Sequence, residues 1–266
     1  MVTRPVFIPE MNHVGVRVIS SAPFAWNPGF SMVQKKKNVA ALHNAIKQMD
    51  ENLLPLEISS RSDECLGIRL SAFNLGVESN GRFFSVESVY QASKVFSNGT
   101  GPFPELYAAN PAEVRNRVKE HETSPLKMYK YGNDVWDLNP TRAFYDWIYC
   151  RALSKNPDLV DGLSAYNCFT DIAFNPVRAV NCQAYAVALY RSLVNCGVVK
   201  DALTDKASFL KYHPSDVVGL SQTNNPLASR KRKRKSACSN EVSQFNLFDL
   251  RNQPVLPKGS GNIFGS

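Results

Sequence analysis

Residues 69–96 read RLSAFNLGVESNGRFFSVESVYQASKVF and combine a hairpin signal with a short helix. The Ser79-Asn80-Gly81 stretch lies between apolar residues and predicts a tight turn between two strands. Ser85 is a favoured N-cap residue, and Asn98-Gly99 is a stop signal, so we expect a helix over the segment 84–96.

A helix turns by about 100° per residue, which places one polar and one apolar stripe on this segment. The polar stripe holds Glu87, Tyr90, Gln91 and Lys94, and the apolar stripe holds Val86, Val89, Ala92 and Phe96. On spacing alone, the polar stripe can be an ordinary solvated face. The alternative is that the carboxylate, the amine, the phenol and the amide share a chemical task.

The composition narrows the class of protein. The chain has 266 residues, 44% of them hydrophobic, which is ample for a packed core. No apolar run approaches the roughly 20 residues of a membrane span, and the N-terminus lacks the apolar stretch of a signal peptide. We therefore expect a soluble intracellular protein that does not enter a membrane.

Metal and cofactor sites have little support in the sequence. The six cysteines form no CxxC pair, no histidine stands at ligand spacing from them, and the four histidines are dispersed. No glycine-rich phosphate loop is present either. We expect no metal and no cofactor, so that chemistry must come from carboxylates, amides, hydroxyls or lysine.

Hydrophobic patterns predict a mixed α/β (α+β) fold for residues 1–213, with several helices around a small sheet. Helices are expected over 31–49, 111–121, 140–154, 157–166 and 181–195, the second of them started by Asn110 and Pro111. Strands are expected at 4–9, 54–60, 65–73 and 168–174, besides the hairpin. No internal repeat is visible.

Residues 214–266 differ in character and are interpreted as a flexible tail. The net charge of the whole chain is +8, and the tail holds eight Lys/Arg against three Asp/Glu, so the preceding part is only mildly basic. Six basic residues are consecutive: Arg230, Lys231, Arg232, Lys233, Arg234 and Lys235. Such a run attracts phosphate backbones, serves as a nuclear import signal, or merely keeps the tail soluble.

Residues 69–96 contain three features in order: the motif Leu-Ser-x-Phe-Asn, the hairpin, and the motif Ser-Val-Glu-x-x-Tyr-Gln-Ala-x-Lys. This order resembles the NADAR (YbiA-like) family, whose members cleave N-glycosidic bonds. Three further stretches resemble the NADAR antitoxins that accompany DNA-guanine ADP-ribosyltransferase toxins, namely 26–46, 140–149 and 169–184. The resemblance covers about residues 1–212, and four motifs in one order are far more specific than one.

The resemblance implies catalytic roles for Glu87 and Lys94. A neutral lysine can form a Schiff base with an opened ribose, while a carboxyl group supplies or shuttles the proton. The lysine needs a lowered pKa for this, which desolvation on a buried helix would provide and an ionised Glu87 would oppose. Asp171 is the other candidate acid, and the sequence does not decide between the two carboxyl groups.

Substrate-binding candidates lie at the expected strand end before the hairpin and on the helix itself. Ser71, Phe73 and Asn74 are placed to hold a base or ribose, although Phe73 can equally be a core residue. Tyr90 and Gln91 share the polar stripe, with Ser85 beside it, and Tyr90 can also be a core tyrosine.

The other candidates come from the two later motifs. Trp147 can stack on adenine or guanine, or pack in the core. Asn175 and Asn181 flank a strand-to-helix turn with Asp171, where Asn181 can be an N-cap and where helix amides would suit a pyrophosphate.

The tail also contains QFNLF, Gln244 to Phe248, an apolar island that resembles the peptide by which bacterial proteins dock on the replication sliding clamp. Gln244, Leu247 and Phe248 would be the docking residues.

Taken together, these features predict an ADP-ribosyl hydrolase that releases ADP-ribose from guanine in ADP-ribosylated DNA, as an antitoxin or a phage anti-defence protein. Its partners would be that DNA, a cognate ADP-ribosyltransferase toxin and the sliding clamp. Two alternatives stay open: an N-glycosidase for a small nucleotide such as a riboflavin-pathway intermediate, and a non-catalytic protein that binds ADP-ribose or the toxin. We expect a cytoplasmic protein, at the nucleoid in bacteria or phage, or a nuclear protein in a eukaryote.

Overall fold

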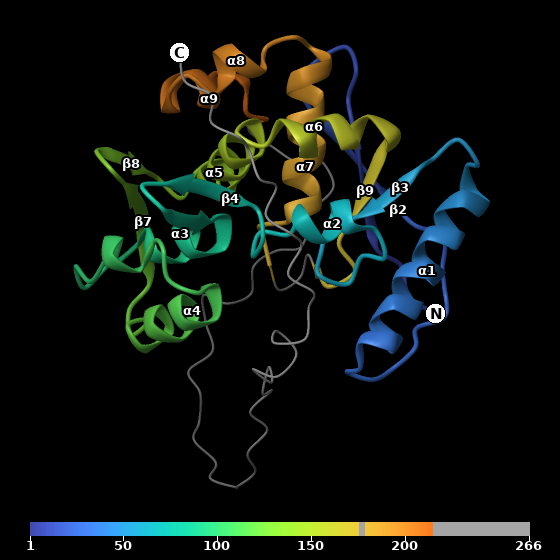
Figure 1. Cartoon of the computed structure of the whole chain (residues 1–266), viewed down its shortest axis with the longest axis horizontal. Coiled ribbons are helices and arrows are strands. Elements are labelled where there is room, and N and C mark those ends of the chain that lie inside the picture. The colour runs from blue at the N-terminus through green and yellow to red at the C-terminus, as the bar shows by residue number, and fades with distance from the viewer. Residues whose placement is uncertain (176–178, 215–266) are drawn as a thin grey trace, which may run out of the picture. The chain divides into compact units, whose positions relative to one another are not determined.

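The computed structural model describes residues 1–175 and 179–214 and has a mixed α+β architecture (Figure 1), as the sequence predicts. The strands are β1 (Pro5–Pro9), β2 (Val16–Ser20), β3 (Pro55–Glu57), β4 (Gly76–Ser79), β5 (Arg82–Ser85), β6 (Lys94–Phe96), β7 (Leu126–Tyr131), β8 (Asp134–Trp136) and β9 (Cys168–Thr170). The helices are α1 (Met32–Met49), α2 (Cys65–Arg69), α3 (Val86–Ala92), η1 (Pro104–Leu106), α4 (Pro111–Glu120), α5 (Ala143–Ser154), α6 (Pro157–Gly162), η2 (Leu163–Ala165), α7 (Gln183–Asn195), α8 (Val199–Ala202) and α9 (Lys206–Tyr212).

A four-stranded sheet in the order β2-β1-β9-β3 is covered on both faces. β1 is antiparallel to β2 and β9, and β3 is parallel to β9. Alternate residues of β1 point to opposite faces, so Val6 packs with α1 residues while the Phe7 ring lies 5.8 Å from the Tyr185 ring of α7. Burial on both sides explains the unbroken apolar run of this strand.

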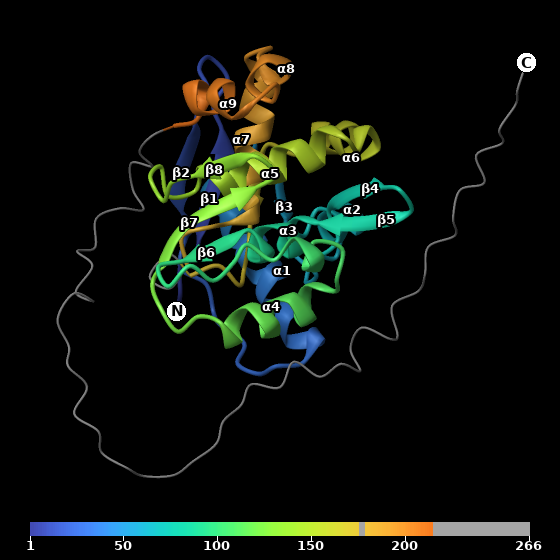
Figure 2. The same cartoon turned by 90° about the vertical axis from the view of Figure 1, so that its left-hand side faces the viewer.

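The other half of the fold surrounds α3. The β4–β5 hairpin leads into α3, and the sheet β6-β7-β8 follows it, in front in Figure 2. Trp136 of β8 and Phe144 of α5 join the main core, and Phe96 of β6 packs with Val114 and Val118 of α4 in a smaller cluster. These contacts fix α3 between α4 and α5.

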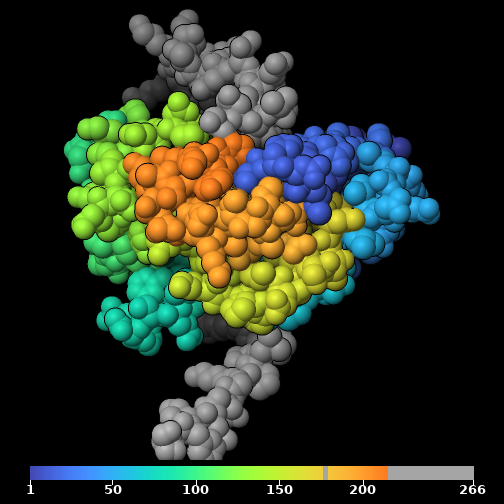
Figure 3. All heavy atoms as spheres, turned by 90° about the horizontal axis from the view of Figure 1, so that it is seen from above, coloured from blue at the N-terminus to red at the C-terminus, as the bar shows by residue number. Residues whose placement is uncertain are grey.

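The face drawn in Figure 3 is made by α6 to α9 beside the N-terminal segment. The amide of Gly15 donates a hydrogen bond to the Ser192 hydroxyl of α7 at 3.0 Å. At the end of α9, the His213 Nε2 lies 3.0 Å from the buried Asp146 carboxylate of α5, and the Arg142 guanidinium lies 3.7 Å from the same oxygen. This buried charge cluster joins α9 to the core. In the described residues no helix is long and apolar enough to cross a membrane.

Several expected elements are confirmed together with their local causes. Ser31 caps α1 by accepting from the Gln34 amide, and Asn110 caps α4 by accepting from the Ala112 amide. In the hairpin, Asn80 and Gly81 have φ angles of 51° and 71°, the positive values that a two-residue turn of this type requires.

The predicted strand at 65–73 is wrong, because residues 65–69 form helix α2. The alternation of Leu66 and Ile68 with small residues resembles a strand, but Gly67 lets the helix backbone approach the Glu57 carbonyl, where a Cβ atom would overlap it. Only the packing of α2 on β3 reveals this.

The helix over 84–96 is shorter than predicted, since α3 ends at Ala92 and Lys94 begins strand β6. The carbonyl oxygens of Ala92 and Ser93 accept hydrogen bonds from the amides of Phe103 and Lys130, and the Ser93 hydroxyl bonds to the Val89 carbonyl. These partners replace the next helical turn. Strands β2, β6, β7 and β8 have no counterpart among the expected elements.

We predict that Gly67→Ala lowers the free energy of unfolding by about 2 kcal/mol or more, although alanine is the better helix former, because the new Cβ meets backbone that cannot move aside. Gly162→Ala in α6 is the matched control: its Cβ would meet only the end of the Leu66 side chain, at 3.1 Å, so the change should stay within about 1 kcal/mol. Denaturant unfolding of both variants measures the difference. Equal stabilities would contradict this packing argument.

Candidate functional site

Glu87 is the centre of the candidate site. It lies in the first turn of α3, where a carboxylate is favoured by the exposed amides, and only 8% of it is accessible. Its Oε1 accepts a hydrogen bond from Gln91 Nε2 at 3.0 Å and lies 3.1 Å from Arg115 Nε of α4. The carboxylate is therefore held in place by an amide and a guanidinium, and the sequence reasoning had not singled out Arg115.

Phe73 lies beside this pair. The Arg115 guanidinium is 5.5 Å from the centre of the Phe73 ring, a cation–π geometry, and 43% of Phe73 remains exposed. The amide of Glu87 donates to the Ala72 carbonyl at 2.9 Å. This backbone bond holds the turn after α2 against the start of α3, so Phe73 and Glu87 stay together.

Ser71 and Asn74 are part of the same turn rather than of a strand. Asn74 donates from Nδ2 to the Ile68 carbonyl at 2.9 Å and so serves the end of α2. The Ser71 hydroxyl is buried and has no hydrogen-bond partner among the described residues. Such a buried group is costly unless a water molecule or another partner satisfies it.

Tyr90 extends the site toward α7 and β7. Its hydroxyl lies 2.7 Å from the Tyr129 hydroxyl and 2.6 Å from Asn181 Nδ2. Burial and the Tyr129 hydroxyl raise the pKa of Tyr90 well above its usual value. Asn181 Oδ1 is buried without a partner in the described part of the chain, and Cys182, not Asn181, is the N-cap residue of α7.

Lys94 reaches the site from a strand, not from the α3 stripe. It pairs with Tyr129 across β6 and β7, and directly opposed residues of antiparallel strands project to the same face. Its Nζ lies 2.8 Å from Glu122 Oε1, and 14% of its side chain is exposed. The expected opposition between Glu87 and Lys94 is thus replaced by two separate ion pairs, Glu87 with Arg115 and Lys94 with Glu122.

Asp171 is joined to the same turn through Gln183. Gln183 Nε2 donates to Asp171 Oδ2 at 3.1 Å, and Gln183 Oε1 accepts from the Ala72 amide at 2.9 Å. Burial raises the pKa of Asp171, although hydrogen bonds from Ala173 and the charge of Arg61 oppose the shift. The carboxyl group can thus hold a proton more readily than an exposed aspartate.

Glu57 is a functional candidate that the sequence reasoning missed. It is buried at the end of β3, where Ser59 and Thr170 hydroxyls and the Ile172 amide donate to its carboxylate at 2.6 to 2.9 Å. Burial, with the Asp171 charge beside it, raises the pKa of Glu57 from 4.5 to about 7. The sequence signal for a buried functional carboxyl group is a glutamate inside the largely apolar stretch LPLEISS.

The remaining candidates have structural partners. Trp147 is 2% exposed and lies 5.0 Å from the Trp136 ring, so it packs in the core. Ser85 caps α3 by accepting from the Ser88 amide. Asn175 is exposed and accepts from the Ala179 amide. The predictions for Arg230 to Lys235 and for Gln244, Leu247 and Phe248 lie outside the described residues.

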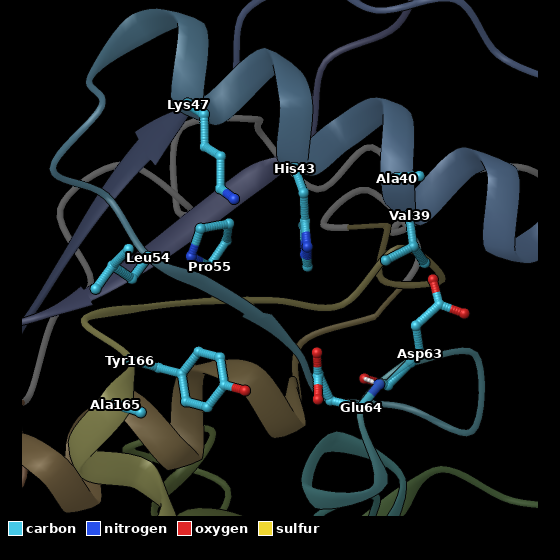
Figure 4. Close-up of a pocket in the computed structure, with 11 residues that line it drawn as sticks. Val39, Ala40, His43, Lys47, Leu54, Pro55, Asp63, Glu64, Ala165 and Tyr166 are labelled. Atoms are coloured by element: carbon cyan, nitrogen blue, oxygen red, sulfur yellow. Dashed lines mark hydrogen bonds between the residues drawn. The ribbon is translucent and has the colours of Figure 1, made fainter.

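A separate pocket of about 290 Å³ lies between α1, β3 and η2 (Figure 4). The side chains of His43, Lys47, Glu64 and Tyr166 point into it. Burial, together with the Lys47 charge, lowers the pKa of His43 to about 4, and its Nε2 lies 3.0 Å from the Thr170 hydroxyl. The motif of residues 26–46 contributes Val39, Ala40 and His43 to this pocket, but none of the candidate catalytic or substrate-binding residues in the described part of the chain lines it. Over residues 1–175 and 179–214, no group of His, Cys, Asp and Glu is arranged to hold a metal ion.

The structure therefore gathers Ser71, Phe73, Glu87, Gln91, Tyr90, Asn181 and Asp171 around one turn, with Lys94 approaching along β6. Carboxyl groups in two environments, together with an amine, suit acid–base and nucleophilic chemistry on a polar ligand.

Comparison with known protein families agrees with the four motifs. The sequence model of the family described as DarT1-associated NADAR antitoxin matches residues 2–223. A search of the curated proteins gave no match.

We predict that the Glu57 carboxyl makes stability fall as the pH rises from about 4.5 to about 7. In this window the folded protein keeps a proton that the unfolded chain has released. The free energy of unfolding therefore decreases as the pH rises. Glu57→Gln should remove this effect, and its stability relative to wild type should rise by up to about 3 kcal/mol across the window.

Chemical denaturation at pH 4.5, 6 and 8 measures the difference. Glu51→Gln, at an exposed position, is the control and should leave the pH profile unchanged. A constant difference between wild type and Glu57→Gln at all three pH values would contradict the assignment.

Proposed function

Because the chain belongs to the family of DarT1-associated NADAR antitoxins, we propose that it is an N-glycosyl hydrolase that cleaves the bond between ADP-ribose and guanine in DNA. It would thereby reverse the modification made by a cognate ADP-ribosyltransferase toxin. The observation that carries this proposal is the buried Glu87 carboxylate, held by Gln91 and Arg115 beside Phe73. The oxygen atoms of Ser71 and Asn181, which have no partner within the described part of the chain, belong to the same cluster.

In the proposed reaction, Lys94 Nζ attacks the anomeric carbon of the ribose. The new C–N bond forms while the bond from that carbon to guanine breaks, and the guanine nitrogen receives a proton from a carboxyl group. The sugar ring opens to an imine, to which water adds and from which the amine leaves. The net products are ADP-ribose and unmodified guanine, at the expense of one water.

Lys94 must lose a proton before it attacks, and Glu122 is the group in contact with it. In this mechanism substrate binding displaces Glu122 from Lys94, so that the Nζ atom can approach the ribose. Glu122 is 28 residues from Lys94 in sequence and lies in the loop after α4, so this loop would control the reactivity of Lys94.

The two carboxyl groups suit different proton-transfer roles. Glu87 is paired with the Arg115 guanidinium, and we assign it the role of proton acceptor. Burial raises the pKa of Asp171, which favours the protonated form and hence the role of acid toward the leaving base. Tyr90 and Asn181 would then orient the sugar through their shared hydrogen bond.

We predict that Lys94→Ala lowers the rate of ADP-ribose release about a thousandfold or more, and Glu87→Gln about a hundredfold or more, because each loses a group that reacts. The substrate is a single-stranded oligonucleotide with one ADP-ribosylated guanine, followed by gel shift. Lys127→Ala, an exposed lysine of β7, is the matched control and should retain wild-type rates.

Borohydride added during turnover should trap ADP-ribose on wild type, at Lys94, and nothing on Lys94→Ala. Release without a trapped adduct would remove the covalent route but keep the hydrolase. If the modification persists with every variant while ADP-ribose or the toxin still binds, the protein is a binding antitoxin. Turnover of a free modified nucleotide alone would favour the small-nucleotide glycosidase.

A further inference from the structure

A second hollow adjoins the candidate site and is not used by the reaction described above. It is an open groove of about 680 Å³ between the β4–β5 hairpin and the segment that leads into α4. Its lining includes Phe73, Arg82, Phe83, Glu105 and Asn110. The volume falls within the roughly 300–1,000 Å³ typical of ligand sites and leaves room for one or a few nucleotides.

The groove ends at the candidate site. Phe73 lines it, and the Phe73 ring lies 5.5 Å from the Arg115 guanidinium, which in turn lies 3.1 Å from Glu87. A molecule whose reacting bond is at Glu87 can therefore continue past Phe73 into the groove without leaving the protein surface.

Two aromatic rings and the arginine Arg82 line the groove, and a second arginine, Arg115, contacts one of these rings. Phe73 and Phe83 are each 43% exposed, although side chains of this size are usually covered. Arg82, which precedes Phe83 in β5, is exposed at the hairpin end of the groove, and Arg115, next to Phe73, has 52% of its side chain exposed. Among the described residues that line the groove, Glu105 alone is acidic.

Exposed aromatic faces interleaved with arginines bind single-stranded nucleic acid, because bases stack on the rings while the guanidinium groups neutralise phosphates. Gly81, in the hairpin turn, lines the outer end of the groove, and a Cβ there would meet no atom of the described residues within 4 Å. A strand can enter there and leave over the hairpin.

We infer that this groove binds the single-stranded DNA next to the modified guanine, with flanking bases stacked on Phe83 and Phe73 and phosphates beside Arg82 and Arg115. The inference rests on the proposed function and extends it, since it makes a DNA strand, rather than a free nucleotide, the preferred substrate.

The test compares two substrates in the full-length protein: a 12-nucleotide single strand with one ADP-ribosylated guanine, and the ADP-ribosylated mononucleotide. Phe83→Leu and Arg82→Ala should each lower the ratio of the two kcat/KM values, oligonucleotide over mononucleotide, about tenfold. Phe83→Tyr, which keeps the aromatic face, should retain the wild-type ratio.

Matched controls come from exposed residues elsewhere. Phe30→Ala, in the loop before α1, and Arg17→Ala, on β2, remove the same kinds of side chain and should leave the ratio unchanged. The basic run 230–235 is present in every variant, so its attraction for DNA affects all measurements alike.

Binding is measured separately, by fluorescence anisotropy with an unmodified 12-nucleotide strand. Phe83→Leu and Arg82→Ala should weaken Kd about tenfold, and Arg82→Ala should also reduce the salt dependence of binding. Unchanged Kd values in both variants would overturn the groove assignment, whatever the turnover. If wild type releases ADP-ribose from neither substrate while the groove variants still weaken binding, the proposed hydrolase fails and the strand-binding groove stands.

Discussion

The site depends on the backbone of one buried residue, Ala72. Its amide donates to Gln183 at the start of α7, and its carbonyl accepts from the Glu87 amide at the start of α3. Two helix ends that are about a hundred residues apart in sequence are thereby held against one turn. Because Ala72 makes both bonds with its main chain, they do not depend on the side chains of the turn, and Phe73 remains exposed beside them.

Several carboxyl groups are buried in the fold, and their partners determine what each can do. Glu57, Asp171 and Asp146 are all nearly or fully inaccessible. Asp146 contacts His213 and Arg142 and joins helices, whereas burial raises the pKa of both Glu57 and Asp171, and the Asp171 charge adds to the shift at Glu57. Buried carboxyl groups that repel each other reduce stability, and such arrangements persist where they serve chemistry. Glu57 and Asp171, the second of which lies within the motif of residues 169–184, fit that pattern.

Local signals predicted a large part of the fold. Caps at Ser31 and Asn110, and the Asn80-Gly81 turn, act within a few residues, so their elements follow from the sequence directly. The failures involve contacts between distant segments. Gly67 fits a helix only because Glu57 lies against it, and α3 ends early because Phe103 and Lys130 bind its last carbonyl groups. The strands β6 to β8 are short, and pairing rather than composition defines them.

The sequence by itself determined the mixed α+β class, the family, and the motif that carries Glu87, Tyr90 and Lys94, because these depend on residue order and local pattern. Only the tertiary structure decided how these residues are used. It placed Lys94 on a strand, where it pairs with Glu122, and it paired Glu87 with Arg115. It also buried Trp147 in the core and revealed Glu57, Gln183 and the groove lined by Phe83. Ion pairs, buried side chains and pockets form where segments distant in sequence come into contact, and local sequence patterns do not predict which segments do so.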